Sequence, residues 1–286
     1  MRYAYETVSK AWGTKFLNSH SDLITLATRP QHSYGTRFVI GEFSLHNRAG
    51  SAAVLGIGGR IQASCWKFYS WTDANYAAGS VLTDDTADAQ DADAGDLNLD
   101  TVGTNNDGFA IGCDVPFNMV SLNISQVSNA NTAWEVYYSK VTAGTGFSNN
   151  FTEIENFYVA PSFGAGNTGE QVIWFDAPAD WHRVLPATAI VNRHGRSNLT
   201  ALGYTAPSQY LLVVKSTTAP DTTRGQATIA TLGHIVMSTV NIASGDLLTN
   251  IGGQDIYLPP ACDAICAATS VANAQNRVDL KWRYSG

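Results

Sequence analysis

The densest group of potential metal ligands is an acidic segment in the first half of the chain. Between Asp84 and Asp100 the sequence contains seven aspartates, at positions 84, 85, 88, 91, 93, 96 and 100. Calcium binds several converging carboxylate oxygens, so this segment is a candidate calcium site. Its spacing does not match the twelve-residue calcium loop, because no glutamate closes the set. The interpretation that we favour is a solvated acidic loop, so we predict no metal site.

A second candidate chemistry is glycoside hydrolysis, which uses two carboxyl groups at a defined separation. Glu153 and Glu155 flank Ile154, so they share one face of a predicted strand. Trp174 and Trp181 would then provide an aromatic platform for a sugar. The simpler interpretation is an acidic loop or strand edge without a catalytic role.

The other reactive residue types show no spacing typical of a catalytic or metal centre. Cys262 and Cys266 have no accompanying pair of ligands, and Cys65 and Cys113 are isolated. We therefore interpret all four as buried thiols in a reduced compartment. No Gly-x-Ser-x-Gly motif occurs, and the glycines at positions 56, 58 and 59 lack the Lys-Ser/Thr of a phosphate loop. The sequence thus predicts no catalytic, cofactor-binding or metal-binding residue, and no enzyme.

Charge and hydropathy exclude several classes of partner. Lys and Arg number 17 against 24 Asp and Glu, a net charge of −7, and only 14% of residues are charged. Globular proteins average about 25% charged residues. Without a basic stripe, binding to nucleic acid or to an anionic membrane is not expected. The N-terminus lacks the pattern of a signal peptide, and the most apolar stretch, residues 52–57, is too short to span a bilayer. We expect a soluble protein made in the cytoplasm.

Period-two alternation predicts about ten short strands and few helices. The clearest alternation is at residues 278–284, and residues 37–46 and 117–125 alternate less regularly. Thr, Ser, Asn, Asp and Gly dominate the polar positions, which is typical of strands and turns. Residues 54–58 and 60–69 are predicted strands joined at Gly58-Gly59, where we expect a tight turn or close backbone packing. This pattern predicts an all-β, antiparallel β-sandwich or jelly roll.

Two features interrupt this strand pattern. Residues 1–35 carry scattered aromatic and basic side chains without alternation, and we predict an N-terminal arm that packs on its own domain or on a partner. The explanation that we favour is an oligomer whose subunits exchange or dock their arms. Residues 36–286 then form the sandwich domain. Short helices are predicted at residues 21–28 and in the alanine-rich stretch 262–274, which follows Pro259-Pro260.

Residues 108–183 resemble a known protein family. The resemblance rests on three stretches: Gly108-Phe109-Ala110-Ile111-Gly112 with Pro116-Phe117-Asn118, then Trp134-Glu135-Val136-Tyr137-Tyr138, and finally the run from Gly169 through Trp174, Phe175 and Pro178 to Asp180-Trp181. This order is similar to β-sandwich modules of tailed-bacteriophage virion proteins, which include capsid decoration (cement) proteins and tail or baseplate accessories. After Trp181 the family returns quickly to a Tyr-Trp-Arg strand, whereas this chain has an insertion at about 184–208.

The resemblance implies a structural virion protein without catalytic residues. The expected role is a decoration protein that binds the major capsid protein on the outer shell, stabilises that shell and forms a homotrimer. A tail, baseplate or head-fibre component is the alternative within the same particle. From a different class, a carbohydrate-binding or hydrolytic jelly roll would use Trp174 and Trp181 as exposed aromatics. The alternative for these two residues is the core, because burying such large rings is favourable.

Overall fold

The chain forms two compact units, and each unit is built from segments that are separated in the sequence. The computed structural model describes all residues except 1–5, 13–23, 29–36, 49, 73–81, 92, 94–96, 130–132, 141–149, 165–167, 185–208, 221, 240, 251–253, 271–275 and 286. Unit 1 comprises Met1–Gln62, Phe117–Ser121 and Thr231–Gly286, and unit 2 comprises Ala63–Pro116 and Leu122–Ala230. This division differs from the arm and single sandwich, 1–35 and 36–286, expected from the sequence. Apart from Val184, the insertion at 184–208 lies outside the described residues.

The described elements are almost all strands. Their bounds in chain order are β1 (Glu6–Trp12), β2 (Ile24–Thr28), β3 (Arg37–His46), β4 (Leu55–Ile61), the 3-10 helix η1 (Ala63–Cys65), β5 (Trp66–Trp71), β6 (Thr83–Asp84), α2 (Thr86–Gln90), β7 (Leu97–Asn98), β8 (Gly108–Cys113), β9 (Met119–Gln126), β10 (Trp134–Ser139), β11 (Phe151–Glu153), β12 (Phe157–Val159), β13 (Gly169–Phe175), β14 (Arg183–Val184), β15 (Gln209–Ser216), β16 (Gln226–Ser238), β17 (Leu247–Asn250), β18 (Ile256–Tyr257), β19 (Cys262–Thr269) and β20 (Asn276–Ser285). The described strand pairings are antiparallel, as in β1–β20 and β15–β8. The predicted all-β, antiparallel class is confirmed.

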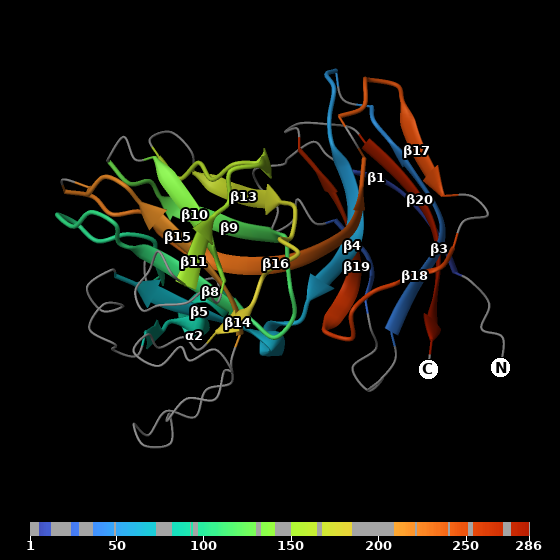
Figure 1. Cartoon of the computed structure of the whole chain (residues 1–286). Coiled ribbons are helices and arrows are strands. Elements are labelled where there is room, and N and C mark those ends of the chain that lie inside the picture. Colours follow the sequence, from blue (N-terminus) through green and yellow to red (C-terminus); the bar gives the residue numbers. More distant parts are fainter. Residues whose placement is uncertain are drawn as a thin grey trace. The chain divides into compact units, whose positions relative to one another are not determined.

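Unit 1 contains two sets of paired strands. In the first, β1, β20, β3 and β17 lie side by side in that order, and β18 also pairs with β3 (Figure 1). In the second, β16, β4, β19 and β2 pair in that order. Phe43 and Leu45 of β3 are buried, as are Val278 and Leu280 of β20. The strong alternation of residues 278–284 therefore marks a strand that buries one face, as the sequence predicts.

The glycines of β4 allow two neighbouring backbones to approach closely. Leu55–Ile61 is one continuous strand, so the predicted turn at Gly58-Gly59 is wrong and the alternative, close packing, is right. A Cβ atom on Gly58 would lie 2.1 Å from the carbonyl oxygen of His234 in β16, and one on Gly59 would lie 2.4 Å from Sγ of Cys262 in β19. Only glycine fits at these two positions, because any side chain would overlap its neighbours.

Both short helices predicted in unit 1 are strands. Cys262–Thr269 forms β19, which pairs with β4 on one side and with β2 on the other. Ile24–Thr28 forms β2, where the sequence suggested a helical turn at 21–28. Alanine favours helices in isolation, but tertiary packing overrides that preference. Ala264, Ala267 and Ala268 are fully buried in β19, where small side chains suit a strand covered on both faces.

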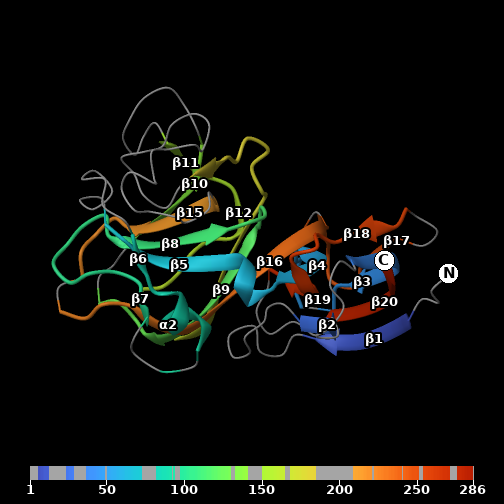
Figure 2. The ribbon, with the colours of Figure 1, turned by 90° about the horizontal axis from the view of Figure 1, so that it is seen from below.

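Unit 2 also contains two sets of paired strands. One has the order β11, β10, β15, β8, β5 and β6, of which β10, β15, β8 and β5 are easily followed in Figure 2. The other has the order β12, β13, β9 and β16. Trp181 connects the two sets, because its ring contacts Phe175 of β13 at 6.1 Å and Tyr138 of β10 at 6.3 Å between centroids. Aromatic rings thus form the core of this sandwich.

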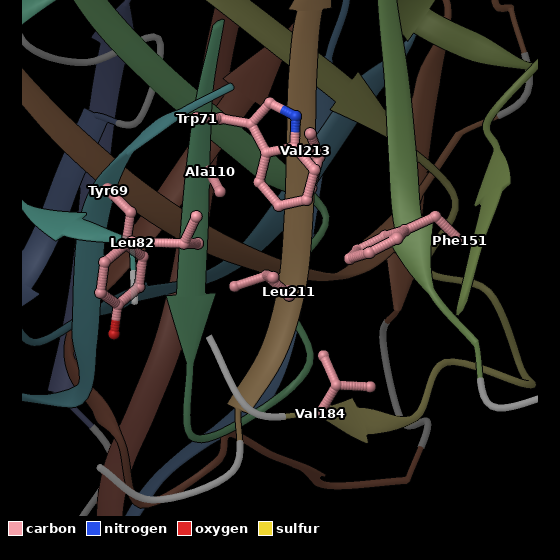
Figure 3. Close-up of a cluster of buried hydrophobic side chains, with 8 residues drawn as sticks. All are labelled: Tyr69, Trp71, Leu82, Ala110, Phe151, Val184, Leu211 and Val213. Carbon is pink, nitrogen blue, oxygen red and sulfur yellow. The ribbon is translucent and has the colours of Figure 1, made fainter. Parts of the chain in front are cut away.

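A second apolar cluster involves β5, β8 and β15 of the same unit. Its eight buried side chains are Tyr69, Trp71, Leu82, Ala110, Phe151, Val184, Leu211 and Val213 (Figure 3). Trp71 of β5 meets Phe151 of β11 edge to face, with ring centroids 5.6 Å apart. Long strands in this sheet are therefore buried on both faces, which explains why β8 and β15 read as nearly continuous apolar runs.

No helix in the described ranges is long and apolar enough to cross a membrane.

Candidate functional site

Tyr138, Asp180 and Trp181, three of the residues that carry the resemblance, meet at one corner of unit 2, which we call the Ser139 corner. It consists of Tyr138, Ser139, Asp180, Trp181 and His182. The Ser139 side chain is fully buried, and its hydroxyl donates to the carbonyl oxygen of His182 at 2.6 Å. Oγ of Ser139 also accepts hydrogen bonds from Trp181 Nε1 and from the backbone N–H of Leu211, both at 3.0 Å. One hydroxyl thereby joins β10, β15 and the segment before β14.

Beside this hydroxyl lies a charged group formed by Tyr138, Lys140 and Asp180. The Tyr138 hydroxyl donates to Oδ1 of Asp180 at 2.9 Å, and Nζ of Lys140 lies 2.6 Å from Oδ2. Arg183 and Asp114 form a longer ion pair of 3.4 Å in the same unit. The corner therefore presents alternating charges that are already paired with one another.

The electrostatics of this group argue against acid–base chemistry. The hydrogen bond from Lys140, followed by that from Tyr138, lowers the pKa of Asp180. The hydrogen bond to Asp180 raises the pKa of Lys140, while burial and then Asp180 raise the pKa of Tyr138. A general acid or base works best with a pKa near the working pH. All three shifts lead away from neutrality, so the group acts as a structural connection.

Replacing Ser139 by alanine is expected to destabilise unit 2 by about 2 kcal/mol, because two buried N–H donors lose their acceptor. The donors are Trp181 Nε1 and the backbone N–H of Leu211. Urea unfolding followed by circular dichroism measures the effect. The matched control is Ser125→Ala, since Ser125 is exposed on β9 of the same unit. Equal midpoints for the two variants would contradict the assigned role of Ser139.

Other residues of the resemblance also have structural roles. A Cβ on Gly108 would lie 1.9 Å from the carbonyl oxygen of Val214, and one on Gly112 would lie 2.2 Å from Oε1 of Gln209. In unit 1, Asn118 donates from Nδ2 to the carbonyl oxygen of Ile235 and accepts the Ile235 N–H at Oδ1. Its side-chain amide thus satisfies the backbone N–H and C=O of Ile235, as the backbone of a neighbouring strand would. These residue types are dictated by packing and backbone pairing.

The described aspartates of the acidic segment do not converge. Asp84 accepts from Lys67 Nζ at 2.8 Å and from the backbone N–H of Thr86, and Asp85 bonds to Ser70. Asp96 lies outside the described residues. Among the residues that the structure describes, no three His, Cys, Asp or Glu side chains are grouped as metal ligands.

Asp100 is the buried member of this segment. It is 3% exposed; its Oδ1 accepts the backbone N–H of Gly225 at 2.7 Å, and its Oδ2 has no hydrogen-bond partner within the described part of the chain. Burial raises the pKa of Asp100, although hydrogen bonds from Gly225 and Ser128 and the charge of Arg224 oppose this. The folded protein therefore holds the neutral carboxyl more tightly than the unfolded chain does.

Asp100 is expected to stabilise unit 2 more at low pH than at high pH. With the folded pKa above the unfolded value of 3.8, the stabilisation is fully present below 3.8 and is lost as the pH rises through the folded pKa. Asp100→Asn removes this titration. The measurement is the difference in free energy of unfolding between wild type and variant at several pH values. A difference that does not change with pH would contradict the prediction.

The sugar platform required for glycoside hydrolysis is absent at the predicted place. Trp174 is 0% exposed and Trp181 is 7% exposed, so neither presents a ring to a ligand. Glu153 and Glu155 are exposed, and burial followed by repulsion from Glu135 and Glu155 raises the pKa of Glu153. The exposed aromatics that the carbohydrate hypothesis requires are therefore not supplied by these residues, and the alternative, that both are core residues, is confirmed. Their size makes them core residues, because burying such rings removes a large apolar area from water.

The four cysteines are free thiols. Cys113, Cys262 and Cys266 are buried, whereas Cys65 is partly exposed. Burial raises the pKa of Cys113 to about 12, so this thiol carries almost no thiolate at neutral pH. The interpretation of these three residues as buried thiols is confirmed.

The chain matches no protein-family model, no curated protein and no solved structure. Its role therefore has to be argued from its own residues.

The sequence did not reveal the bonding partners that hold this corner together. Ser139 is 42 residues from Trp181 and 72 residues from Leu211, and Tyr138 is 42 residues from Asp180. The aromatic residues at 134, 138 and 181 were conspicuous, but nothing in their spacing identified a serine as the residue that joins them. A partial signal for the role of Ser139 is its position, as a small polar residue at the end of the aromatic strand Trp134–Ser139.

Proposed function

We propose that the protein is a structural component of a tailed-bacteriophage virion. In this role it is a decoration protein that binds the major capsid protein on the outer shell and resists internal pressure, as a homotrimer and without a catalytic residue. The observation that carries the proposal is the Ser139 corner, where the resembling residues Tyr138, Asp180 and Trp181 bond or pack together. This arrangement supports a shared structural module, because these residues hold the sandwich together and none is displayed for chemistry.

A surface of unit 1 supports the contact with other subunits. On β3, β20 and the residue before β18, three ion pairs join Lys281 to Glu42, Arg283 to Asp255 and Arg277 to Asp279. At the edge of the same sheet, Leu247 of β17 is 54% exposed and Tyr257 of β18 is 53% exposed. Neutralised charges with exposed large apolar side chains are typical of surfaces that bind protein. We assign the capsid contact to this edge, which we call the β17–β18 edge.

The test is binding to expanded, undecorated capsids of the phage that encodes this chain. Co-sedimentation measures binding, and the temperature at which the capsids lose their shape measures stabilisation. The expected result is saturable binding with a higher disruption temperature. Absence of binding to such capsids would overturn the proposal. Labelling of virions with an antibody separates the alternative, since signal at the tail would indicate a tail, baseplate or fibre component.

Variants of the β17–β18 edge make the test specific. Leu247→Asp is expected to weaken capsid binding at least tenfold while leaving the circular dichroism and the thermal midpoint unchanged, because Leu247 is more than half exposed. The matched control is Val102→Asp, which places the same charge at a 42% exposed position in unit 2. Equal binding by both variants would reject the assigned edge but not the capsid role.

A further inference from the structure

The N-terminal segment contributes one outer strand to each set of strands in unit 1. β1 is the first strand in the order β1, β20, β3 and β17, and among the described strands its partner is β20. β2 is the last strand after β16, β4 and β19, and its partner in the described ranges is β19. Both strands therefore add to an edge of their set, and neither lies between two other described strands.

The β1–β20 pairing is regular over its whole length. Seven consecutive residue pairs run from Glu6 with Trp282 to Trp12 with Asn276, without a register shift. Such a ladder is held by backbone hydrogen bonds, which any copy of the same segment can form in the same way.

Unit 1 also contains strand pairs that do not involve this segment. β20 pairs with β3 and β19 pairs with β4, independently of β1 and β2. The largest fully buried side chains of this unit include Phe38, Phe43 and Leu45, all on β3. Loss of the segment would expose two strand edges, those of β20 and β19.

Without β2, the edge of β19 would present unpaired backbone groups that can pair with another strand. Of its residues Ala264, Ile265, Cys266 and Ala267, none is charged, and Asp263 is engaged in a two-point ion pair with Arg60 at 2.9 and 3.1 Å. Natural proteins protect exposed edges with charges, bulges or covering segments. The edge of β19 therefore needs a covering strand. Residues 24–28 form that strand, and they can come from the same chain or from a second copy.

We infer that residues 1–28 are an exchangeable strand donor, and that a second copy of this chain can supply β1 and β2 to unit 1. A monomer that uses its own β1 and β2 and a dimer that has exchanged them contain the same strand pairs. Their free energies therefore differ only through the conformation of the segment between β2 and β3 and through the effective concentration of the donor strands. The connection to β3 is eight residues long, residues 29–36, and spans at most about 26–29 Å when extended. The inference does not rest on the proposed function, although the dense packing of copies in a shell would favour exchange.

The test uses the full-length chain with a cysteine pair across the β1–β20 ladder. Ser9 lies opposite Asp279, so Ser9→Cys with Asp279→Cys places two thiols within reach of a disulfide. Equal amounts of ¹⁴N- and ¹⁵N-labelled protein are mixed at high concentration, equilibrated, oxidised and digested. Mass spectrometry then counts cross-linked peptides that contain both labels. Exchange predicts a mixed fraction that approaches about one half, the value for random pairing.

A second cysteine pair serves as the matched control. Asp279 also lies opposite Ser44 of β3, so Ser44→Cys with Asp279→Cys tests an interior pair of the same sheet. This cross-link should contain a single label in every peptide. An efficient cross-link between positions 9 and 279 without mixed peptides would overturn the exchange. Failure of that pair to form any disulfide, while the control forms one, would also overturn it, because the β1–β20 pairing is its premise. Capsid binding does not enter this readout.

Discussion

Trp174→Ala is expected to lower the free energy of unfolding by about 3–5 kcal/mol, the usual cost of removing a large buried aromatic ring. Trp174 is fully buried on β13, and its ring lies 4.9 Å from that of Tyr158, centroid to centroid. The substitution leaves a cavity whose lining loses its contacts, since the strands on either side are held in place by their ladders. Urea unfolding followed by far-UV circular dichroism measures the loss.

The control for this variant is a truncation at an exposed site of the same unit. Val102→Ala should change the free energy of unfolding by less than about 0.5 kcal/mol, because Val102 is 42% exposed. A glycan array adds a second readout. If Trp174→Ala kept the wild-type stability and lost binding to a glycan, the ring would be a sugar platform and its assignment to the core would be wrong.

Gly58→Val is expected to destabilise unit 1 by about 3 kcal/mol or more, because overpacking forces a backbone to move. The three nearest atoms to a Cβ on Gly58 all belong to the backbone of His234 and Ile235, at 2.1 to 2.9 Å. A flexible side chain would rotate away, but a backbone in a strand ladder does not. The thermal midpoint and the far-UV spectrum at low temperature measure the effect.

Gly50→Val is the matched control for this substitution. It introduces the same side chain in the same unit, at a position where a Cβ has nothing within 4 Å among the described residues. Its thermal midpoint should stay within a few degrees of wild type. Similar losses for both variants would show that valine disturbs the chain through its general strand preference, and the close approach of β4 and β16 would not be the cause.

The fold class was predictable because it depends on local properties that the sequence displays. Residues 278–284 alternate between apolar and polar side chains, and they form most of β20 with Val278, Leu280 and Trp282 buried. The abundance of Thr, Ser, Asn, Asp and Gly at polar positions led to the same conclusion. Each of these signals acts within one strand or one turn, so no knowledge of distant contacts was needed.

The errors arose where burial depends on distant segments. Residues 262–269 are alanine-rich and suggested a helix, but β4 and β2 flank them as strands and leave room only for small side chains. Gly58-Gly59 suggested a turn, whereas the glycines are required by the approach of His234 and Cys262 from other strands. For Trp174 and Trp181 the sequence left a sugar platform and a core position both open, because a sequence does not tell which face of a strand is covered; both are buried.

The sequence by itself determined the all-β class, the absence of any spacing typical of a catalytic motif, and the low content of charged residues. These properties follow from residue types and short-range periodicity, which do not depend on which distant segments come into contact. Only the tertiary structure decided that Ser139 joins Trp181 to Leu211, that Asp100 is buried beside Gly225, and that β1 and β2 cover two separate edges. Those facts depend on pairs of residues far apart in the chain, and such pairs meet only when the strands have found their neighbours.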